Sequence, residues 1–125
     1  MSNSPIVESI MSRKLVTVTP ADSIRVAIER MREHQCRRLP VLEGGKLVGI
    51  VTDRDLRRAT NSPFVLRERW YDEFVLDNIS VKACMSSNPR TVTPQTKIVE
   101  AARLMRDKKI GGLPVVDKDA LVGMV

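Results

Sequence analysis

The chain contains one internal repeat. Segments 11–51 and 85–125 align without a gap at an offset of 74 positions, and 17 of the 41 aligned positions are identical. The shared stretches occur in the same order in both segments: M-S, T-V-T-P, L-P-V and L-V-G. Self-similarity of this extent indicates one structural unit that is built twice. Because a unit of about 50 residues buries its apolar surfaces poorly on its own, we expect the two copies to pack together with pseudo-two-fold symmetry.

Each copy begins with a pattern that predicts a strand followed by a helix. In the first copy, Leu15–Val18 alternates and is rich in β-branched residues, which predicts a short strand. Thr19 is a capping residue, Pro20 suits the first helical position and Asp22 would complete a capping box, so we expect a helix to start there. Apolar residues then recur at helical spacing. They are Ile24, Ala27, Ile28 and Met31 in the first copy, and Ile98, Ala101, Ala102 and Met105 in the second.

The rest of each copy predicts a hairpin and a second helix. Residues 39–42 and 47–52 of the first copy predict two strands joined by a turn at 43–46, and a helix is expected from Asp53 to Ala59. The predicted fold class is therefore α+β, with the order β-α-β-β-α repeated twice. Because the sequence stops at Val125, we expect the second copy to lack its last helix.

A connector at 59–78 separates the copies. It holds the four aromatic residues of the chain, which are Phe64, Trp70, Tyr71 and Phe74. We expect them to pack the connector onto the domain or onto a second subunit; base stacking on Trp70 or Tyr71 is the functional alternative. The predicted boundaries are 6–58 for the first repeat and 79–125 for the second.

Composition and charge exclude several classes of protein. Apolar residues make up 42% of the chain, no apolar run approaches the ~20 residues of a membrane span, and the N-terminus lacks a signal pattern, so we expect a cytoplasmic protein with no membrane partner. The net charge of +6 divides into +4 over 1–62, with 11 basic and 7 acidic residues, and +2 over 63–125, with 10 and 8. Nucleic-acid-binding proteins typically carry a denser stripe of basic residues than this chain does, so a nucleic-acid-binding function is disfavoured.

The segment 49–55, G-I-V-T-D-R-D, carries the clearest candidate site. A glycine within the strand, Gly49, allows close approach of a ligand or of another backbone. Thr52 could donate to phosphate, and Asp55, three residues on, could accept both hydroxyls of a ribose. The same two residues could equally form a simple helix cap without any ligand. The spacing alone favours neither interpretation.

The repeated motifs resemble those of the cystathionine-β-synthase (CBS) domain family, over about 6–58 and 79–125. The resemblance implies a tandem CBS pair, or Bateman module, that binds adenosine-derived ligands (AMP, ADP, ATP, sometimes S-adenosylmethionine) in clefts between the repeats. The family's G-h-h-T-x-x-D segment, which contacts ribose and phosphate, matches Gly49, Thr52 and Asp55. The base-contacting and second-strand segments match Val16, Thr17, Arg38, Leu39 and Pro40. Positions equivalent to Thr52 and Asp55 would be 126 and 129, so we expect at most one intact nucleotide site.

Basic residues surround the candidate site. They are Arg37, Arg38, Arg54, Arg57 and Arg58. The second copy has Gly111 and Gly112 where the first has Arg37 and Arg38, which suggests an added phosphate contact in the first copy. The alternative is solvated surface charge. For Lys108 and Lys109 we expect a cation pair at a helix C-terminus.

The sequence shows no catalytic or metal-binding constellation. The single histidine, His34, lies near Cys36, but two ligands do not make a metal site. The other cysteine, Cys84, has no neighbouring base, so neither thiol suggests a nucleophile, and we expect no metal and no enzymatic activity.

The function predicted from the sequence is a regulatory, non-catalytic module. It would bind AMP, ADP or ATP, with Mg²⁺ accompanying ATP, and would transmit ligand occupancy through a homodimer to a regulated protein partner that the sequence does not identify. One alternative is a ligand-free dimerisation scaffold. The other is a nucleic-acid-binding module, motivated by the basic charge and by Trp70 and Tyr71.

Overall fold

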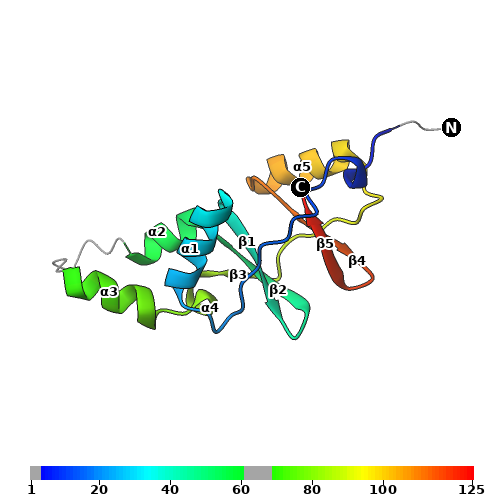
Figure 1. Cartoon of the computed structure of the whole chain (residues 1–125). Helices are drawn as coiled ribbons and strands as arrows, with labels where there is room; N and C mark the ends of the chain where they lie inside the picture. Colours follow the sequence, from blue (N-terminus) through cyan, green and yellow to red (C-terminus); the bar gives the residue numbers. More distant parts are fainter. Residues whose placement is uncertain (1–3, 61–68) are drawn as a thin grey trace. The chain divides into compact units, whose positions relative to one another are not determined.

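The computed structural model describes residues 4–60 and 69–125, with the backbone alone for 69–73 (Figure 1). Contacts divide the chain into two compact units. The first-copy unit consists of 16–44 and 48–88, and the second-copy unit consists of 45–47, 89–125 and the residues up to Leu15. Each unit has its own hydrophobic core.

The first-copy unit is built on a three-stranded sheet. Strands β1 (Arg38–Glu43), β2 (Lys46–Thr52) and β3 (Ser86–Ser87) lie in the order β1-β2-β3, and β3 pairs antiparallel with β2. The turn between β1 and β2 holds Gly44 and Gly45 at φ +58° and +80°. Left-handed values at both positions are what a two-residue hairpin turn requires, and glycine adopts them without steric cost.

Among the described residues, four helices complete this unit. They are α1 (Ile24–His34), α2 (Asp53–Thr60), α3 (Arg69–Asn78) and α4 (Val81–Cys84). α1 contacts both α2 and α3 (Figure 1), and Arg25 on α1 donates to the carboxylate of Asp77 on α3. The core between helices and sheet consists of Val18, Ile24, Ala27, Met31, Leu39, Val41, Val51, Leu56, Val75 and Val81.

The second-copy unit repeats the plan with fewer elements. It contains the short helix η1 (Val7–Ser9), the helix α5 (Ile98–Lys108) and the antiparallel pair β4 (Pro114–Asp117) and β5 (Ala120–Met124). Its core consists of Val7, Met11, Val92, Ala101, Leu113 and Val115.

The M-S motif of each copy packs in the unit of the other copy. Met85 and Ser86 lie against Gly49 on β2, where a Cβ would approach Met85 Sδ to 2.7 Å and the Ser86 carbonyl oxygen to 2.8 Å. Met11 and Ser12 lie in the same way against Gly123 on β5, where a Cβ would approach Met11 Sδ to 2.9 Å and the Ser12 carbonyl oxygen to 2.8 Å. Real Cβ atoms do not approach this closely, so both glycines are required by the paired backbone.

The predicted start of the first copy needs two corrections. Only Val18 of the expected strand at Leu15–Val18 pairs, through a parallel bridge to Val41. The helix does not start at Pro20 but at Ile24, with Ser23 as its N-cap, because residues 19–22 form a separate turn. In that turn the Thr19 N–H donates to Asp22 Oδ2 at 2.8 Å and the Asp22 N–H to the Thr19 carbonyl at 3.2 Å, so Thr19 and Asp22 do interact, one turn before the helix.

The apolar helix faces predicted from the sequence are buried more completely in the first copy than in the second. Ile24, Ala27 and Met31 are buried, whereas Ala102 on α5 is exposed. In the connector, Phe74 is 58% exposed and so packs little against the described residues, and packing of this ring onto a second subunit stays a prediction. Phe64 and the side chains of Trp70 and Tyr71 lie outside the described residues.

Candidate functional site

Thr52 and Asp55 meet where β2 runs into α2. The Thr52 N–H donates to Asp55 Oδ2 at 2.9 Å, and the Asp55 N–H donates to Thr52 Oγ1 at 3.2 Å. This reciprocal pair is a capping box, which satisfies two backbone donors at the helix start. The cap interpretation of the sequence is therefore confirmed as local structure.

The capping box leaves functional groups available for a ligand. Thr52 Oγ1 is the acceptor in its bond, so its own proton remains to be donated. Only Oδ2 of Asp55 is used among the hydrogen bonds of the described residues, and both side chains are half-buried. The cap thus fixes both side chains in place without consuming the hydroxyl proton or the second carboxylate oxygen.

Cys84 lies close to this junction. α2 and α4 are in contact, and the pKa of the Cys84 thiol is raised above its ordinary value, first by burial and then by the negative charge of Asp55. The negative charge of Asp55 on α2 therefore reaches the thiol on the neighbouring helix α4. Sequence reasoning treated Cys84 as an isolated thiol and missed this proximity, since the two residues are far apart in the chain.

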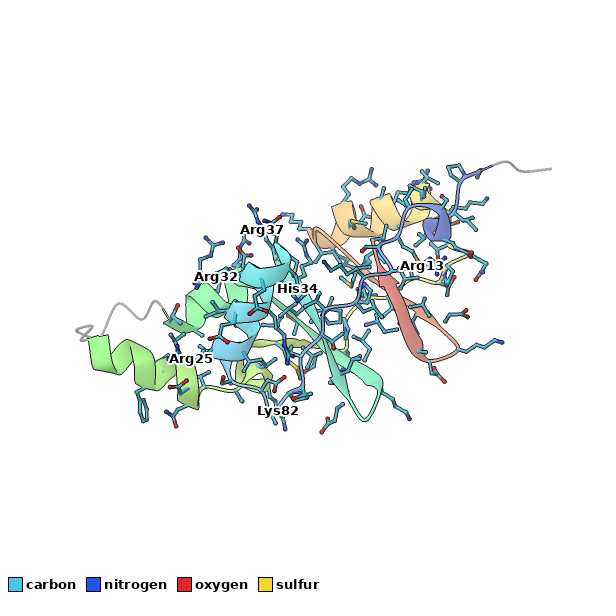
Figure 2. The ribbon with its side chains drawn as sticks, viewed as in Figure 1. Arg13, Arg25, Arg32, His34, Arg37 and Lys82 are labelled. Atoms are coloured by element: carbon cyan, nitrogen blue, oxygen red, sulfur yellow. The ribbon has the colours of Figure 1, made fainter. Side chains whose placement is uncertain are left out.

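The arginines gather where β1 and α2 begin. The Asp53 N–H donates to the Arg37 carbonyl at 3.0 Å, which joins the residue before β1 to the first turn of α2. Figure 2 labels Arg37, which lies between α1 and β1. Arg37 and Arg54 are exposed, and Arg38 is half-buried. On α2, Arg57 forms an i,i+4 ion pair with Asp53 at 3.2 Å.

The remaining predicted site residues belong to the same unit but differ in how far their side chains are buried. Leu39 and Pro40 are fully buried, so their side chains are part of the core. Val16 packs at the edge of that core. The Thr17 carbonyl accepts a hydrogen bond from Arg30 Nη1 at 2.6 Å. Contact of these residues with a ligand stays a prediction.

Arg30 also approaches Asp22, at 3.5 Å, so that α1 holds the segment before it. Sequence reasoning missed this contact. The alignment of the two copies could have indicated it, because both charged residues are replaced together in the second copy, by Leu104 and Thr96.

Each unit has a shallow pocket beside its T-V-T-P segment. The first-copy pocket has a volume of about 410 Å³ and is lined by Thr19, Pro20, Ala21, Leu42, Glu43, Gly44, Ser80 and Lys82. The second-copy pocket has a volume of about 510 Å³ and is lined by Thr91, Val92, Thr93, Thr96, Glu100, Leu104, Val116, Lys118 and Asp119. Neither pocket includes Thr52 or Asp55, and the sequence analysis anticipated neither.

Two further observations concern the described residues only. Across 4–60 and 69–125, no group of three or more His, Cys, Asp or Glu side chains is arranged to hold a metal ion. Over the same ranges, no helix has the length and apolar character needed to cross a membrane.

The comparison with protein families decides the classification. The model of the CBS domain matches twice, at residues 7–62 and 81–125. The chain belongs to the CBS domain family. A CBS domain-containing protein of Dictyostelium discoideum is 41% identical over 125 residues, which cover 96% of this chain and 84% of the relative.

Solved CBS-pair structures share the fold of this tandem CBS chain. CBSX2 of Arabidopsis thaliana, solved in complex with AMP, aligns with a TM-score of 0.78 and 32% identity, covering 95% of this chain and 88% of that one. The CBS pair of protein MJ0100, solved with 5′-methylthioadenosine and S-adenosylmethionine, aligns at 0.80 with 27% identity, covering 98% and 89%. Similar CBS pairs therefore bind adenosine-type ligands.

Proposed function

We propose that this CBS pair is a regulatory, non-catalytic module that binds an adenine nucleotide at the junction of β2 and α2. In this proposal the Thr52 hydroxyl donates to phosphate and the free oxygen of Asp55 accepts from the ribose. Assembly as a homodimer and transmission to a protein partner are parts of the same proposal. Mg²⁺ would accompany ATP.

The observation that carries the proposal is the reciprocal Thr52–Asp55 pair. Its two hydrogen bonds hold both side chains in position before any ligand arrives, while a hydroxyl proton and a carboxylate oxygen remain available. Preorganised polar groups bind with less loss of conformational entropy than mobile ones. Support for the ligand class comes from CBSX2, which was solved with AMP.

Calorimetric titration of Asp55→Asn tests the proposal. We expect the unmodified chain to bind one AMP, ADP or ATP per chain, and Asp55→Asn to lose at least tenfold in affinity, because the amide no longer offers a charged acceptor to the ribose hydroxyls. Asp53→Asn is the matched control. It removes a carboxylate from the same helical turn, where Asp53 pairs with Arg57 rather than with Thr52, and should change affinity less than threefold.

Three outcomes would contradict the proposal. Binding that is equal in Asp55→Asn and in the unmodified chain would remove Asp55 from the site. Absence of binding by AMP, ADP, ATP and S-adenosylmethionine would favour a ligand-free scaffold, in which Thr52 and Asp55 serve only as the helix cap. Binding to nucleic acid that does not depend on Asp55 and weakens steeply with salt would favour a nucleic-acid-binding module.

A further inference from the structure

The second-copy pocket corresponds to a place that an arginine side chain takes up in the first copy. Arg30 of α1 donates from Nη1 to the Thr17 carbonyl at 2.6 Å and lies 3.5 Å from Asp22 Oδ2. In the alignment of the two copies, Arg30 matches Leu104 of α5, and Thr17 matches Thr91. Leu104 and Thr91 both line the pocket of about 510 Å³. The shorter leucine therefore leaves open the space into which the guanidinium of the first copy extends.

The backbone acceptor of the first copy is also present in the second. Thr91 is exposed and precedes Val92, which pairs with Val115 of β4. Within residues 4–60 and 69–125, no hydrogen bond is donated to the Thr91 carbonyl, whereas the matching Thr17 carbonyl accepts from Arg30. A carbonyl oxygen carries two lone pairs, so the Thr91 carbonyl can accept from a ligand in this pocket.

The turn before each helix shows that the change concerns charge rather than folding. In the first copy the Thr19 N–H donates to Asp22 Oδ2 at 2.8 Å. In the second copy the Thr93 N–H donates to Thr96 Oγ1 at 3.0 Å, so a hydroxyl replaces the carboxylate in the same turn. Asp22 has a second role, which is its ion pair with Arg30. The second copy keeps the turn and lacks both members of that ion pair.

Two other carboxylates line the second-copy pocket. They belong to Glu100 and Asp119, where the first copy has the uncharged residues Val26 and Gly45. Both side chains are exposed, and neither forms an ion pair in the described part of the chain. Lys118 supplies the one positive charge among the lining residues. With two carboxylates against one ammonium group, the pocket favours a ligand that carries positive charge.

We infer that this pocket is a second ligand site, which takes a small molecule with a guanidinium group on an alkyl stem, such as free arginine. The guanidinium donates to the Thr91 carbonyl and pairs with the Glu100 carboxylate. The alkyl stem packs along Leu104, as arginine stems do on apolar surface, and Lys118 meets an α-carboxylate. The ligand thus makes in the second copy the kind of contacts that Arg30 makes in the first.

The size and the place of the pocket agree with this inference. A volume of about 510 Å³ lies within the usual range of small-molecule sites. All lining residues belong to the second-copy unit, whereas Thr52 and Asp55 belong to the first-copy unit. The guanidinium site is therefore separate from the proposed nucleotide site and does not depend on it.

Calorimetric titration of the full chain with L-arginine and with L-citrulline, without nucleotide, tests the inference. L-citrulline has the same stem and α-groups, but a neutral ureido group replaces the guanidinium. We expect saturable binding of L-arginine and about tenfold weaker binding of L-citrulline, because the charge-assisted contacts are lost. Equal affinity for the two ligands would overturn the inference. Absence of saturable binding at millimolar L-arginine would overturn it as well.

Two variants test the residues of the pocket. Leu104→Arg/Thr96→Asp introduces the ion pair of the first copy and should abolish L-arginine binding, because the chain's own guanidinium then takes up the space. Glu100→Gln leaves the pocket open and should weaken L-arginine binding by about tenfold. Because Glu100 is exposed, this single variant keeps the test valid if the double variant fails to fold.

Asp107→Asn is the matched control. It removes a carboxylate from the same helix, where Asp107 pairs with Arg106 at 3.1 Å and does not line the pocket. Its affinity for L-arginine should stay within about twofold of that of the unmodified chain. L-arginine affinity that is unchanged in Glu100→Gln would overturn the inference. An equal loss in Glu100→Gln and Asp107→Asn would also overturn it, because the effect would then follow net charge rather than the pocket.

Discussion

At the scale of the residue, single side chains near the junction serve more than one purpose. Asp55 caps α2 through Oδ2, and its charge also acts on the thiol of Cys84. Gly49, which the sequence offered as a point of close approach to a ligand or a backbone, is required by the backbone of Ser86 and the side chain of Met85. The local geometry is thus specified by folding, and any ligand contact uses the groups that folding leaves free.

The raised pKa of Cys84 gives a prediction at this scale. Because burial and the Asp55 charge disfavour the thiolate, we expect the alkylation rate of Cys84 to titrate with a midpoint above that of a cysteine in the unfolded chain. The measurement uses a Cys36→Ser background, so that only Cys84 reacts. Asp55→Asn should move the midpoint down, since it removes the neighbouring negative charge.

The same shift fixes the sign of the effect on stability. The folded state holds the Cys84 proton more tightly than the unfolded state does. The protonated thiol therefore contributes to the free energy of unfolding below the unfolded pKa, and this contribution is lost as pH rises through the folded pKa. The alkylation midpoint of Cys84 in urea-denatured protein is the reference for the midpoint in the folded protein. A folded midpoint at or below the denatured one would show that Cys84 is neither buried nor close to Asp55.

At the scale of the element, the two hairpins use the same turn with different residues. The first copy places Gly44 and Gly45 in the left-handed region, and the second copy places Lys118 and Asp119 there, at φ +51° and +66°. A side chain in this conformation costs roughly 1 kcal/mol, because Cβ crowds the backbone. The β4–β5 turn is therefore the more strained of the two.

Exchanging the turn residues tests this difference. We expect Lys118→Gly/Asp119→Gly to raise the free energy of unfolding by about 1 kcal/mol and Tm by about 3 °C, with thermal unfolding followed by circular dichroism. The reciprocal change, Gly44→Lys/Gly45→Asp, should lower both. A Cβ at either glycine meets no atom within 4 Å, so its cost comes from the backbone alone. Equal stability of all three chains would mean that these turns carry no conformational strain.

At the scale of the whole molecule, the compact units do not follow the order of the repeats. The first-copy core includes Val75 and Val81, and β3 lies beyond the predicted first repeat. In the same way, Val7 and Met11 belong to the core of the second-copy unit. The opening segment of each copy therefore completes the fold of the other.

Fragments of the chain test this organisation. We expect residues 16–88, which contain the whole first-copy core, to unfold in one cooperative thermal transition when expressed alone. Residues 6–58, cut at the sequence repeat, lack Val75, Val81 and β3 and should show no such transition, because buried apolar side chains would become exposed. A cooperative transition for 6–58 with no gain for 16–88 would contradict the exchange of segments.

Sequence alone determined the duplication, the α+β class and the hairpin and helix that flank the candidate site. It could do so because apolar periodicity, glycine turns and capping residues act over a few neighbouring positions. It also identified the Thr52–Asp55 pair, whose two members are three residues apart, but it could not choose between a cap and a ligand site.

Only the tertiary structure decided which segments complete each core and which groups remain free. The pairing of Gly49 with Met85 and Ser86, and the effect of Asp55 on Cys84, join residues that are distant in the chain. No local pattern encodes such contacts, because they depend on how the chain returns to the same sheet. The helix start at Ile24 was misplaced for a related reason. The Thr19–Asp22 contact that the sequence favoured does form, but it closes a separate turn whose preceding segment is held by Val41 and Arg30, and Ser23 caps the helix by accepting from the Val26 N–H.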